Sequence, residues 1–397
     1  MSISSDPDLL VLWYWTRSIN PNLLDQAARQ IPDSTKRLRA DVVGGNYDSK
    51  LRTSLAGGAY IPDIAGVNSN CSLYFPNEER FVDLNPLGGS ELKSQFYDWK
   101  WQLGTTPKGR MCFWPMDTGP TGLYYRNDLF AKAGLPSDPD ALGEAIKTWD
   151  GYLDVGTQLR KKLDIALDIN AGAVFGCYLN SSEERYFDRQ DRPIFSQSGS
   201  AVRKAWDLAV QAAKLGVTGN LQTSNDQNAG WSSGRVAGHL EAVWWGPILA
   251  DTAPDTKGKW RLANQPVKPG NSGGSFLMVP TTSKDPQAAF DFIKWLTNAE
   301  NQAKTFNTIQ LFPSTPASFT GDTLKSDNSF YGGQEYQTFF RKAAEQVPIT
   351  YVSPYENLCA PFGSELTNVE TAGKDPNQAW DDAVAAVDQV LHKRGLV

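Results

Sequence analysis

The chain has 397 residues, which is enough for two or three domains at about 150 residues per domain. Its composition, with 40% hydrophobic and 21% charged residues, is that of a soluble globular protein. The net charge of -6 argues against a nucleic-acid partner, because phosphate backbones need clustered Lys and Arg. No stretch approaches the roughly 18 apolar residues that a membrane span needs.

Tryptophan is unusually frequent in this chain and histidine unusually rare. There are 13 tryptophans against 2 histidines and 4 cysteines. The cysteines lie dozens of residues apart, so they form none of the close pairs of a zinc site, and we expect neither a metal nor a cofactor. They fit buried free thiols as well as two disulfides. The excess of large apolar side chains with a polar edge favours binding over catalysis.

Strands and helices are predicted to alternate in the first third of the chain. The continuous apolar run at 9–15 is too short for a helix and predicts a buried strand of a parallel sheet. A helix at 22–30, a strand at 42–43, a helix at 47–55 and a strand beginning at 62–65 follow. This alternation predicts βαβ units and an α/β sheet that is covered on both faces. The basic run at 36–39 indicates a solvated connection between a helix and a strand.

In such sheets the loops after the carboxyl ends of strands line the ligand crevice. Three loops are therefore candidates, at 14–17, 66–70 and 115–120. The third lies between two apolar-aromatic runs, and it fits an ordinary turn as well as a crossover between two domains.

The rest of the chain continues in the same α/β style. Amphipathic spacing predicts helices at 149–163 and 202–215, and Asp285 and Pro286 supply the N-cap and first residue of another helix. The remaining predictions are a strand end at 243–247, a strand at 275–280, a C-terminal helix at 377–393, and loop-rich regions at 216–234 and 314–333.

Several weak motifs form an ordered set that spans nearly the whole chain. They are a helix with a glycine and a Pro-Asp strand at 47–64, the segments 81–87 and 123–135, the Thr148-Trp149 pair, the Trp-x-x-Gly-Arg-Val-Ala motif at 231–237, and the segments 273–280 and 288–302. Together they resemble the extracellular solute-binding proteins of carbohydrate ABC transporters, the family-1 group that includes maltose-binding protein. The polar segment 180–197 does not match the group. Its signal peptide or lipobox cysteine is also absent, which we interpret as trimming of the chain.

The resemblance implies a two-lobed, type II-like periplasmic-binding-protein fold, in which each lobe is a mixed sheet flanked by helices. Lobe 1 is expected at 1–117 and 276–314, lobe 2 at 118–275 and 315–397, and hinges near 117–120, 274–278 and 313–315. The lobes are expected to close over a sugar, which is then delivered to an ABC transporter permease. The resemblance also implies a monomer outside the cytoplasm, in the periplasm or lipid-anchored on the outer face of the membrane.

A sugar site needs aromatic platforms for C–H faces and short polar side chains for hydroxyls. Trp244 and Trp245 are the leading platform candidates, and because neighbours on a strand point to opposite faces, at most one should face the ligand. Trp15, at the end of the first strand, is a third candidate. Tyr351 and Tyr355 are candidates through the resemblance, since the second lobe often offers an aromatic there.

The polar candidates each have a plainer interpretation. Asn68, Ser69 and Asn70 suit vicinal hydroxyls as well as turn chemistry. Asp117, at the proposed crossover with Thr118, fits a hydroxyl acceptor as well as a helix cap. Arg17, beside Thr16, suits pairing with such a carboxylate or bonding to a hydroxyl, but it fits a surface arginine better. Gly273 and Gly274, followed by Ser275, fit close backbone approach as well as hinge flexibility. His239 fits a structural histidine better than a ligand contact.

Two functions from different classes fit these features. The first is a binding protein without enzyme activity, and the second is a glycoside hydrolase. A hydrolase needs two carboxylates about 5–10 Å apart across the scissile bond. The adjacent pairs Glu78-Glu79 and Glu183-Glu184 do not suit this, since sequence neighbours rarely face each other across a cleft, and no motif supports a distant pair. The sequence therefore favours capture of an oligosaccharide.

Overall fold

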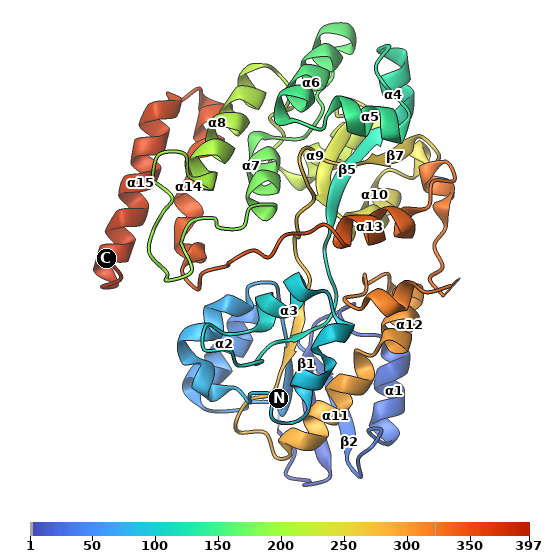
Figure 1. Cartoon of the computed structure of the whole chain (residues 1–397), viewed down its shortest axis with the longest axis vertical. Coiled ribbons are helices and arrows are strands. Elements are labelled where there is room, and N and C mark those ends of the chain that lie inside the picture. Colours follow the sequence, from blue (N-terminus) through green and yellow to red (C-terminus); the bar gives the residue numbers. More distant parts are fainter. Residues whose placement is uncertain (1–2, 322) are drawn as a thin grey trace. The chain divides into compact units, whose positions relative to one another are not determined.

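The computed structural model describes residues 3–321 and 323–397. The chain divides into two compact units, one made of Met1–Gly119 and Gly273–Lys325 and the other of Pro120–Ser272 and Ser326–Val397. The chain therefore passes between the units at three places, after Gly119, Ser272 and Lys325 (Figure 1).

These boundaries differ from the predicted ones, because Thr118, Gly119, residues 273–275 and residues 315–325 belong to the first unit. Local hydrogen bonds explain the difference. The Thr118 amide donates to the Phe312 carbonyl over 2.9 Å, and the Ser275 amide donates to the Asp117 carboxylate over 3.0 Å. The Lys325 amide donates to the Asn307 side chain over 2.7 Å, so the chain stays with the first unit well past residue 315.

The first unit is built on a five-stranded sheet with the order β2-β1-β3-β8-β4. β1 is parallel to β2 and β3, whereas β8 is antiparallel to β3 and β4, so the sheet is mixed. Its elements are β1 (Leu9–Tyr14), α1 (Pro21–Arg29), β2 (Arg37–Val42), α2 (Tyr47–Gly57), β3 (Ile64–Val67), α3 (Asp98–Gly104), β4 (Trp114–Pro115), β8 (Phe276–Met278), α11 (Pro286–Leu296) and α12 (Ala299–Ile309), with 3₁₀ segments η1 (Cys71–Arg80), η2 (Gly89–Gln95) and η4 (Pro316–Phe319).

Helices cover both faces of this sheet, as predicted. Successive residues of a strand point to opposite faces, and β1 is buried on both. Leu10 and Leu12 pack in one cluster with side chains of α1 and α11. Val11 and Trp13 pack in a second cluster with side chains of α2. Figure 1 shows α1 and α11 on one side of β1 and α2 on the other.

The interpretation of 36–39 as a solvated connection is wrong, because Arg37–Val42 forms β2. β2 is an edge strand, and only one of its faces needs to be apolar. Leu38 is buried in the core, while Arg37 lies at the surface and pairs with Asp6 over 3.0 Å. The third strand also begins later than predicted, at Ile64, and extends through Val67.

The second unit is built on a three-stranded antiparallel sheet with the order β6-β5-β7. Its elements are β5 (Thr121–Arg126), α4 (Asn127–Lys132), α5 (Pro139–Ala145), α6 (Trp149–Leu163), α7 (Ala171–Asn180), α8 (Ala201–Lys214), α9 (Ser224–Ser233), β6 (Gly238–Ala242), α10 (Trp245–Thr252), β7 (Trp260–Ala263), α13 (Tyr336–Ala344), α14 (Ala360–Ala372) and α15 (Pro376–Lys393), with 3₁₀ segments η3 (Pro254–Thr256), η5 (Asn328–Tyr331) and η6 (Glu356–Cys359).

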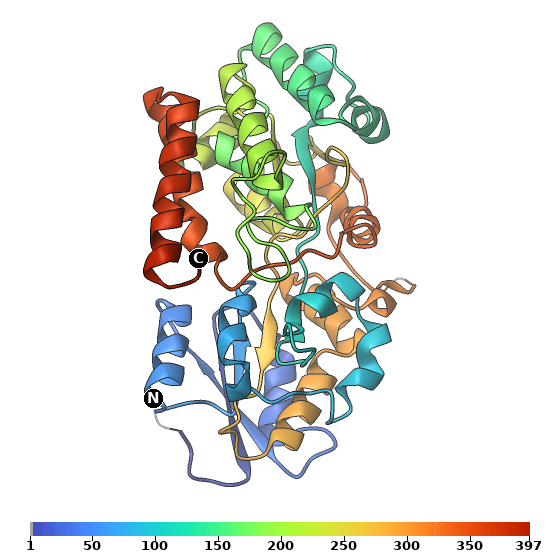
Figure 2. The same cartoon turned by 60° about the vertical axis from the view of Figure 1, so that its left-hand side comes forward.

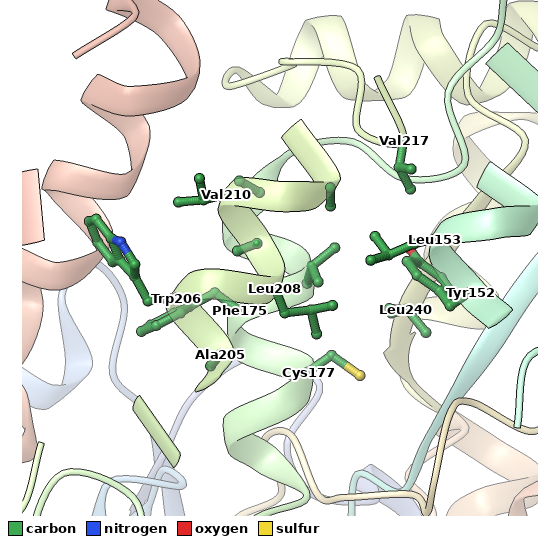
Figure 3. Close-up of a cluster of buried hydrophobic side chains, with 14 of the residues drawn as sticks. Tyr152, Leu153, Phe175, Cys177, Ala205, Trp206, Leu208, Val210, Val217 and Leu240 are labelled. Carbon is green, nitrogen blue, oxygen red and sulfur yellow. The ribbon is translucent and has the colours of Figure 1, made fainter. Parts of the chain in front are cut away.

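One large apolar cluster joins this sheet to its helices. Phe175 and Cys177 of α7 and Trp206 and Leu208 of α8 belong to it, together with Leu240 of β6 (Figure 3). The last two helices, α14 and α15, lie side by side and are drawn in red in Figures 1 and 2. The Trp206 and Trp380 rings, 5.5 Å apart, join α15 to α8.

Helices with strong local signals are confirmed. α6 has the predicted bounds, and the Asp285 carboxylate caps α11 by accepting the Ala288 amide over 3.0 Å. Two expectations are wrong. The loop-rich region at 216–234 contains α9, and residues 243–247 are not a strand end, since β6 stops at Ala242 and α10 begins at Trp245.

The four cysteines are buried free thiols, which decides between the two interpretations of their spacing. Among the described helices, none has the length and apolar character to cross a membrane.

Candidate functional site

The predicted loops of the first unit lie at one edge of its sheet. β1, β3 and β4 run in the same direction and β8 runs opposite, so the carboxyl ends of the first three meet the amino end of β8 at that edge. The loops after Tyr14, Val67 and Pro115 and the residues before Phe276 therefore lie together. From β1 to β4 they span three strand spacings, or roughly 14 Å.

Trp15 is held in a defined position at the end of β1, and part of its ring is exposed. The ring lies 5.0 Å from the ring of Tyr47, whose hydroxyl donates to the carbonyls of Trp13 and Gly66. A Cβ at position 66 would lie 2.9 Å from the Trp15 ring, so glycine leaves room for the indole. Thr16 and Arg17 follow as exposed residues, and Arg17 has a left-handed backbone with φ of 62°.

The polar loop after β3 is partly accessible. Asn68 is half-buried and donates from Nδ2 to the Asp48 carboxylate over 2.8 Å. Ser69 is exposed. Asn70 precedes η1, but its side chain makes no capping hydrogen bond. Capping of η1 therefore does not explain why an asparagine stands at this position.

Asp117 joins the end of β4 to the start of β8. One oxygen of its carboxylate accepts both the amide and the hydroxyl of Ser275. Asp117 is half-buried, and it bridges two segments instead of capping a helix. Gly273 and Gly274 precede Ser275 with φ of 80° and 82°, and a Cβ on Gly274 would lie 2.7 Å from the Asp117 carbonyl oxygen. Backbone conformation and packing therefore both require glycine at position 274.

The side chains of Thr118 and Ser275 are buried, so the prediction that they contact a ligand directly does not suit this structure. Thr118 is 1% exposed, and its hydroxyl donates to the carbonyls of Phe312 and Pro313. Ser275 is 5% exposed, and its hydroxyl is engaged by Asp117. Both side chains position the backbone around Asp117.

Lys100 lies behind this segment and was missed by the sequence analysis. It comes from α3, and a Cβ on Gly274 would lie 2.9 Å from its Nζ. The ammonium group lies 3.7 Å from the centroid of the Phe276 ring. Burial lowers the pKa of Lys100 to about 8, and the negative charge of Asp117 opposes this effect.

In the second unit the two adjacent tryptophans have different environments. Trp245 is 4% exposed and packs against the rings of Trp231 and Tyr124, so its prediction as a platform is wrong. Trp244 is half-buried, and its indole N–H donates to the Ser272 carbonyl over 2.9 Å. The two tryptophans differ in burial because α10 starts between them, with Trp244 as its N-cap residue and Trp245 as its first helical residue.

A carboxylate that the sequence analysis missed bonds to the same residue, Ser272, as Trp244 does. Glu241 is the fourth residue of β6, and its side chain is 21% exposed. Its carboxylate accepts the Ala242 amide over 2.7 Å and the side-chain hydrogen bond of Ser272. Trp244 and Glu241 are thus both attached to Ser272, although one bond is to its carbonyl and the other to its side chain. The sequence signal that could have identified Glu241 was its position on the strand, two residues after His239 and so on the same face of the sheet.

Tyr351 and Tyr355 lie on a different part of the second unit. The Tyr351 hydroxyl donates to the Asp191 carboxylate, and its amide donates to the Glu183 carbonyl over 2.8 Å. The half-buried ring of Tyr355 lies 6.2 Å from that of Phe187. Both tyrosines therefore contact the polar segment 180–197.

One hollow of the first unit, mostly apolar, is partly lined by Ser18, Asn20, Asp117 and Phe312. Of the predicted site residues only Asp117 lines it, so this hollow does not unite them. Within residues 3–321 and 323–397, no group of three or more His, Cys, Asp or Glu side chains is placed to hold a metal ion.

Comparison with known proteins gives consistent matches. The sequence model of the bacterial extracellular solute-binding proteins matches residues 42–331. The lactose-binding protein of Rhizobium radiobacter is 26% identical, with 88% of this chain and 85% of that protein covered. The arabinooligosaccharide-binding protein of Bacillus subtilis (strain 168) is 24% identical, with coverage of 91% and 87%.

The fold agrees with these matches. A crystal structure of an extracellular solute-binding protein of family 1 is 27% identical and superposes with a TM-score of 0.91, covering 96% of this chain and 99% of that chain. The family match spans well over half of the chain and includes β3, β5 and β6. The chain therefore belongs to the bacterial extracellular solute-binding protein family.

Proposed function

We propose that this protein binds a neutral di- or oligosaccharide outside the cytoplasm, as a monomer, and delivers it to an ABC transporter permease. The observation that carries the proposal is the edge of the first unit's sheet, where the Trp15 ring, the Asn68–Asn70 loop and the Asp117 carboxylate lie together. An aromatic face beside short polar groups is the chemistry that a sugar requires. The lactose and arabinooligosaccharide specificities of two relatives support the choice of a saccharide.

Within the first unit, Trp15 is the proposed stacking platform, and the polar contacts are Thr16, Arg17, Asn68, Ser69, Asn70 and Asp117, with the backbone of Gly273 and Gly274. Trp244 is the proposed platform of the second unit. Tyr351 and Tyr355 remain predictions from the resemblance alone. The three connections after Gly119, Ser272 and Lys325 are the proposed hinges.

Binding is favoured over hydrolysis by the placement of the adjacent glutamates. Glu78 is buried and Glu79 is exposed, so they do not form a facing pair, and Glu183 and Glu184 are both exposed on the polar segment. A hydrolase would need two carboxylates across one bond. The family supports binding for transport as well.

The test is a titration followed by both calorimetry and tryptophan fluorescence, using lactose, arabinotriose and a series of neutral di- to hexasaccharides. Each mixture is then examined by chromatography for cleavage products. Saturable binding of at least one intact sugar is expected. Turnover of the sugar would support the hydrolase instead. Failure of every sugar to bind, with binding of amino acids or polyamines, would overturn the proposal.

A further inference from the structure

Three ionisable side chains, Asp168, His239 and Glu241, form a series in the second unit that ends at Glu241. It begins at Asp168, whose side chain is fully buried. The Asp168 carboxylate accepts the amides of Ile169 and Leu240, and one of its oxygens lies 2.7 Å from Nδ1 of His239. These bonds fix the imidazole, because three groups from two segments of the chain hold the same carboxylate.

His239 in turn faces Glu241. Its Nε2 lies 3.8 Å from the nearer Glu241 oxygen, which is close enough for electrostatic attraction but too long for a hydrogen bond. Burial alone would lower the pKa of His239, but the adjacent Asp168 carboxylate outweighs it and raises that pKa. Burial raises the pKa of Glu241, and the His239 charge opposes that effect.

Exposure increases along this series toward the surface. The side chain of Asp168 is 0% exposed, that of His239 7% and that of Glu241 21%. Only Glu241 can therefore meet a ligand directly. Its carboxylate has acceptor capacity left after the bonds from Ala242 and Ser272, since an ionised carboxylate accepts at about four lone-pair positions.

The cluster has more acidic than basic groups. With His239 protonated and both carboxylates ionised, two carboxylates face one imidazolium, which leaves a net charge of about -1. The charged groups that shift the pKa of His239 are Asp168 and Glu241, and those that shift the pKa of Glu241 are His239 and Asp168. A mostly buried excess charge is unfavourable unless donors are supplied to it.

We propose that Glu241 is a ligand-contacting residue that selects neutral or cationic saccharides and rejects anionic ones. It accepts sugar hydroxyls beside the Trp244 ring, to which it is connected through Ser272. A charged acceptor makes stronger hydrogen bonds than a neutral one and repels a carboxylate or phosphate on the ligand. This inference rests on the proposed function and adds the charge class of the sugar to it.

The test compares the parent protein with Glu241→Gln, which keeps the side-chain shape and the acceptor for the Ala242 amide but removes the charge. Calorimetry measures binding of lactose and arabinotriose as neutral probes, the glucosamine disaccharide as the cationic probe and digalacturonic acid as the anionic probe. The parent is expected to bind its preferred neutral probe at least 100-fold more tightly than digalacturonic acid. Glu241→Gln is expected to weaken neutral binding at least tenfold and to reduce this preference at least tenfold.

Two further variants separate charge from structure. Glu241→Asp keeps the charge and is expected to keep rejecting digalacturonic acid, even where its shorter side chain weakens neutral binding. Glu183→Gln removes a carboxylate that is 72% exposed elsewhere in the second unit and is expected to leave all affinities unchanged. Thermal unfolding of each variant checks that the second unit is folded.

Several outcomes overturn the inference while the proposed function stands. They are a parent that binds digalacturonic acid as tightly as the neutral probes, and a Glu241→Gln variant that binds all probes as the parent does. If Glu241→Gln does not fold, the parent's own preference and that of Glu241→Asp decide the question. If the parent binds no saccharide at all, the proposed function itself has failed.

Discussion

Replacing Lys100 by methionine is expected to stabilise the first unit. The Lys100 side chain is completely buried, and its ammonium has no hydrogen-bond partner among the described residues. Burial lowers its pKa from the ordinary 10.5 to about 8. At about 1.4 kcal/mol per pH unit, this difference corresponds to roughly 3 kcal/mol. Methionine has a similar volume and no charge, so Lys100→Met should recover most of that free energy at pH 7.

The pH dependence gives the sign of this effect independently. Below pH 8 both the folded and the unfolded protein carry the proton, and the folded protein bears the full cost of the buried charge. Between about pH 8 and 10.5 only the unfolded protein keeps the proton, so the cost disappears as the pH rises. The parent should therefore approach the stability of Lys100→Met across that range.

Urea unfolding at a series of pH values, followed by tryptophan fluorescence, measures this difference for the transition of the first unit. Lys108→Met is the matched control, because Lys108 is exposed on the chain segment after α3, and it should change stability by less than about 0.5 kcal/mol. The reasoning is refuted if Lys100→Met is less stable than the parent at pH 7. It is also refuted if the difference between parent and variant stays constant between pH 7 and 10.5.

Three further predictions concern the second unit and the thiols. Trp244→Ala is expected to weaken sugar binding at least tenfold, or about 1.4 kcal/mol, without changing the free energy of unfolding. Trp245→Ala should instead destabilise the second unit by about 3–5 kcal/mol, because Trp245 is buried. Calorimetry measures the first effect and urea unfolding the second. Because the pKa of His239 is raised in the folded protein, its ion pair with Asp168 stabilises the second unit below pH 6.5. This stabilisation is lost as the pH rises through the raised pKa. In Asp168→Asn the free energy of unfolding should therefore depend less on pH over that range. A thiol reagent should modify none of the four cysteines in the native protein and all four in urea, so rapid native labelling would contradict their burial.

Secondary structure was predictable where local signals decide it. α6 and α11 begin at side chains that cap them, Thr148 and Asp285, so both starting points are readable from the sequence. The second strand was predicted at 42–43 only, and its start at Arg37 was missed because Arg37 and Arg39 are typical of solvated connections. Only the place of β2 at the sheet edge makes these arginines acceptable in a strand. α9 was missed because it has few apolar residues, with Trp231 its one large buried side chain.

The candidate site was predictable in position but not in detail. The alternation of strands and helices predicts parallel strands, so the gathering of Trp15, Asn68 and Asp117 at one edge follows from where the strands end. The burial of Thr118 depends on carbonyls of Phe312 and Pro313, which lie 194 and 195 residues further along the chain. The importance of Glu241 depends on Asp168, which meets His239 across 71 residues. Neither separation leaves a local pattern.

Two of the charges described above are each tied to a residue near the connection of the chain after Ser272. Lys100 lies against Gly274 in the first unit, and Glu241 is hydrogen-bonded to Ser272 in the second. Neither charge is needed to form a core, because apolar residues of similar volume often stabilise a protein equally well or better. Charges kept at such a cost are typical of sites where binding, and not stability, determines the residue. If Lys100→Met is more stable than the parent and also binds sugar with full affinity, then binding does not explain the buried charge of the first unit. The explanation would then apply to Glu241 alone.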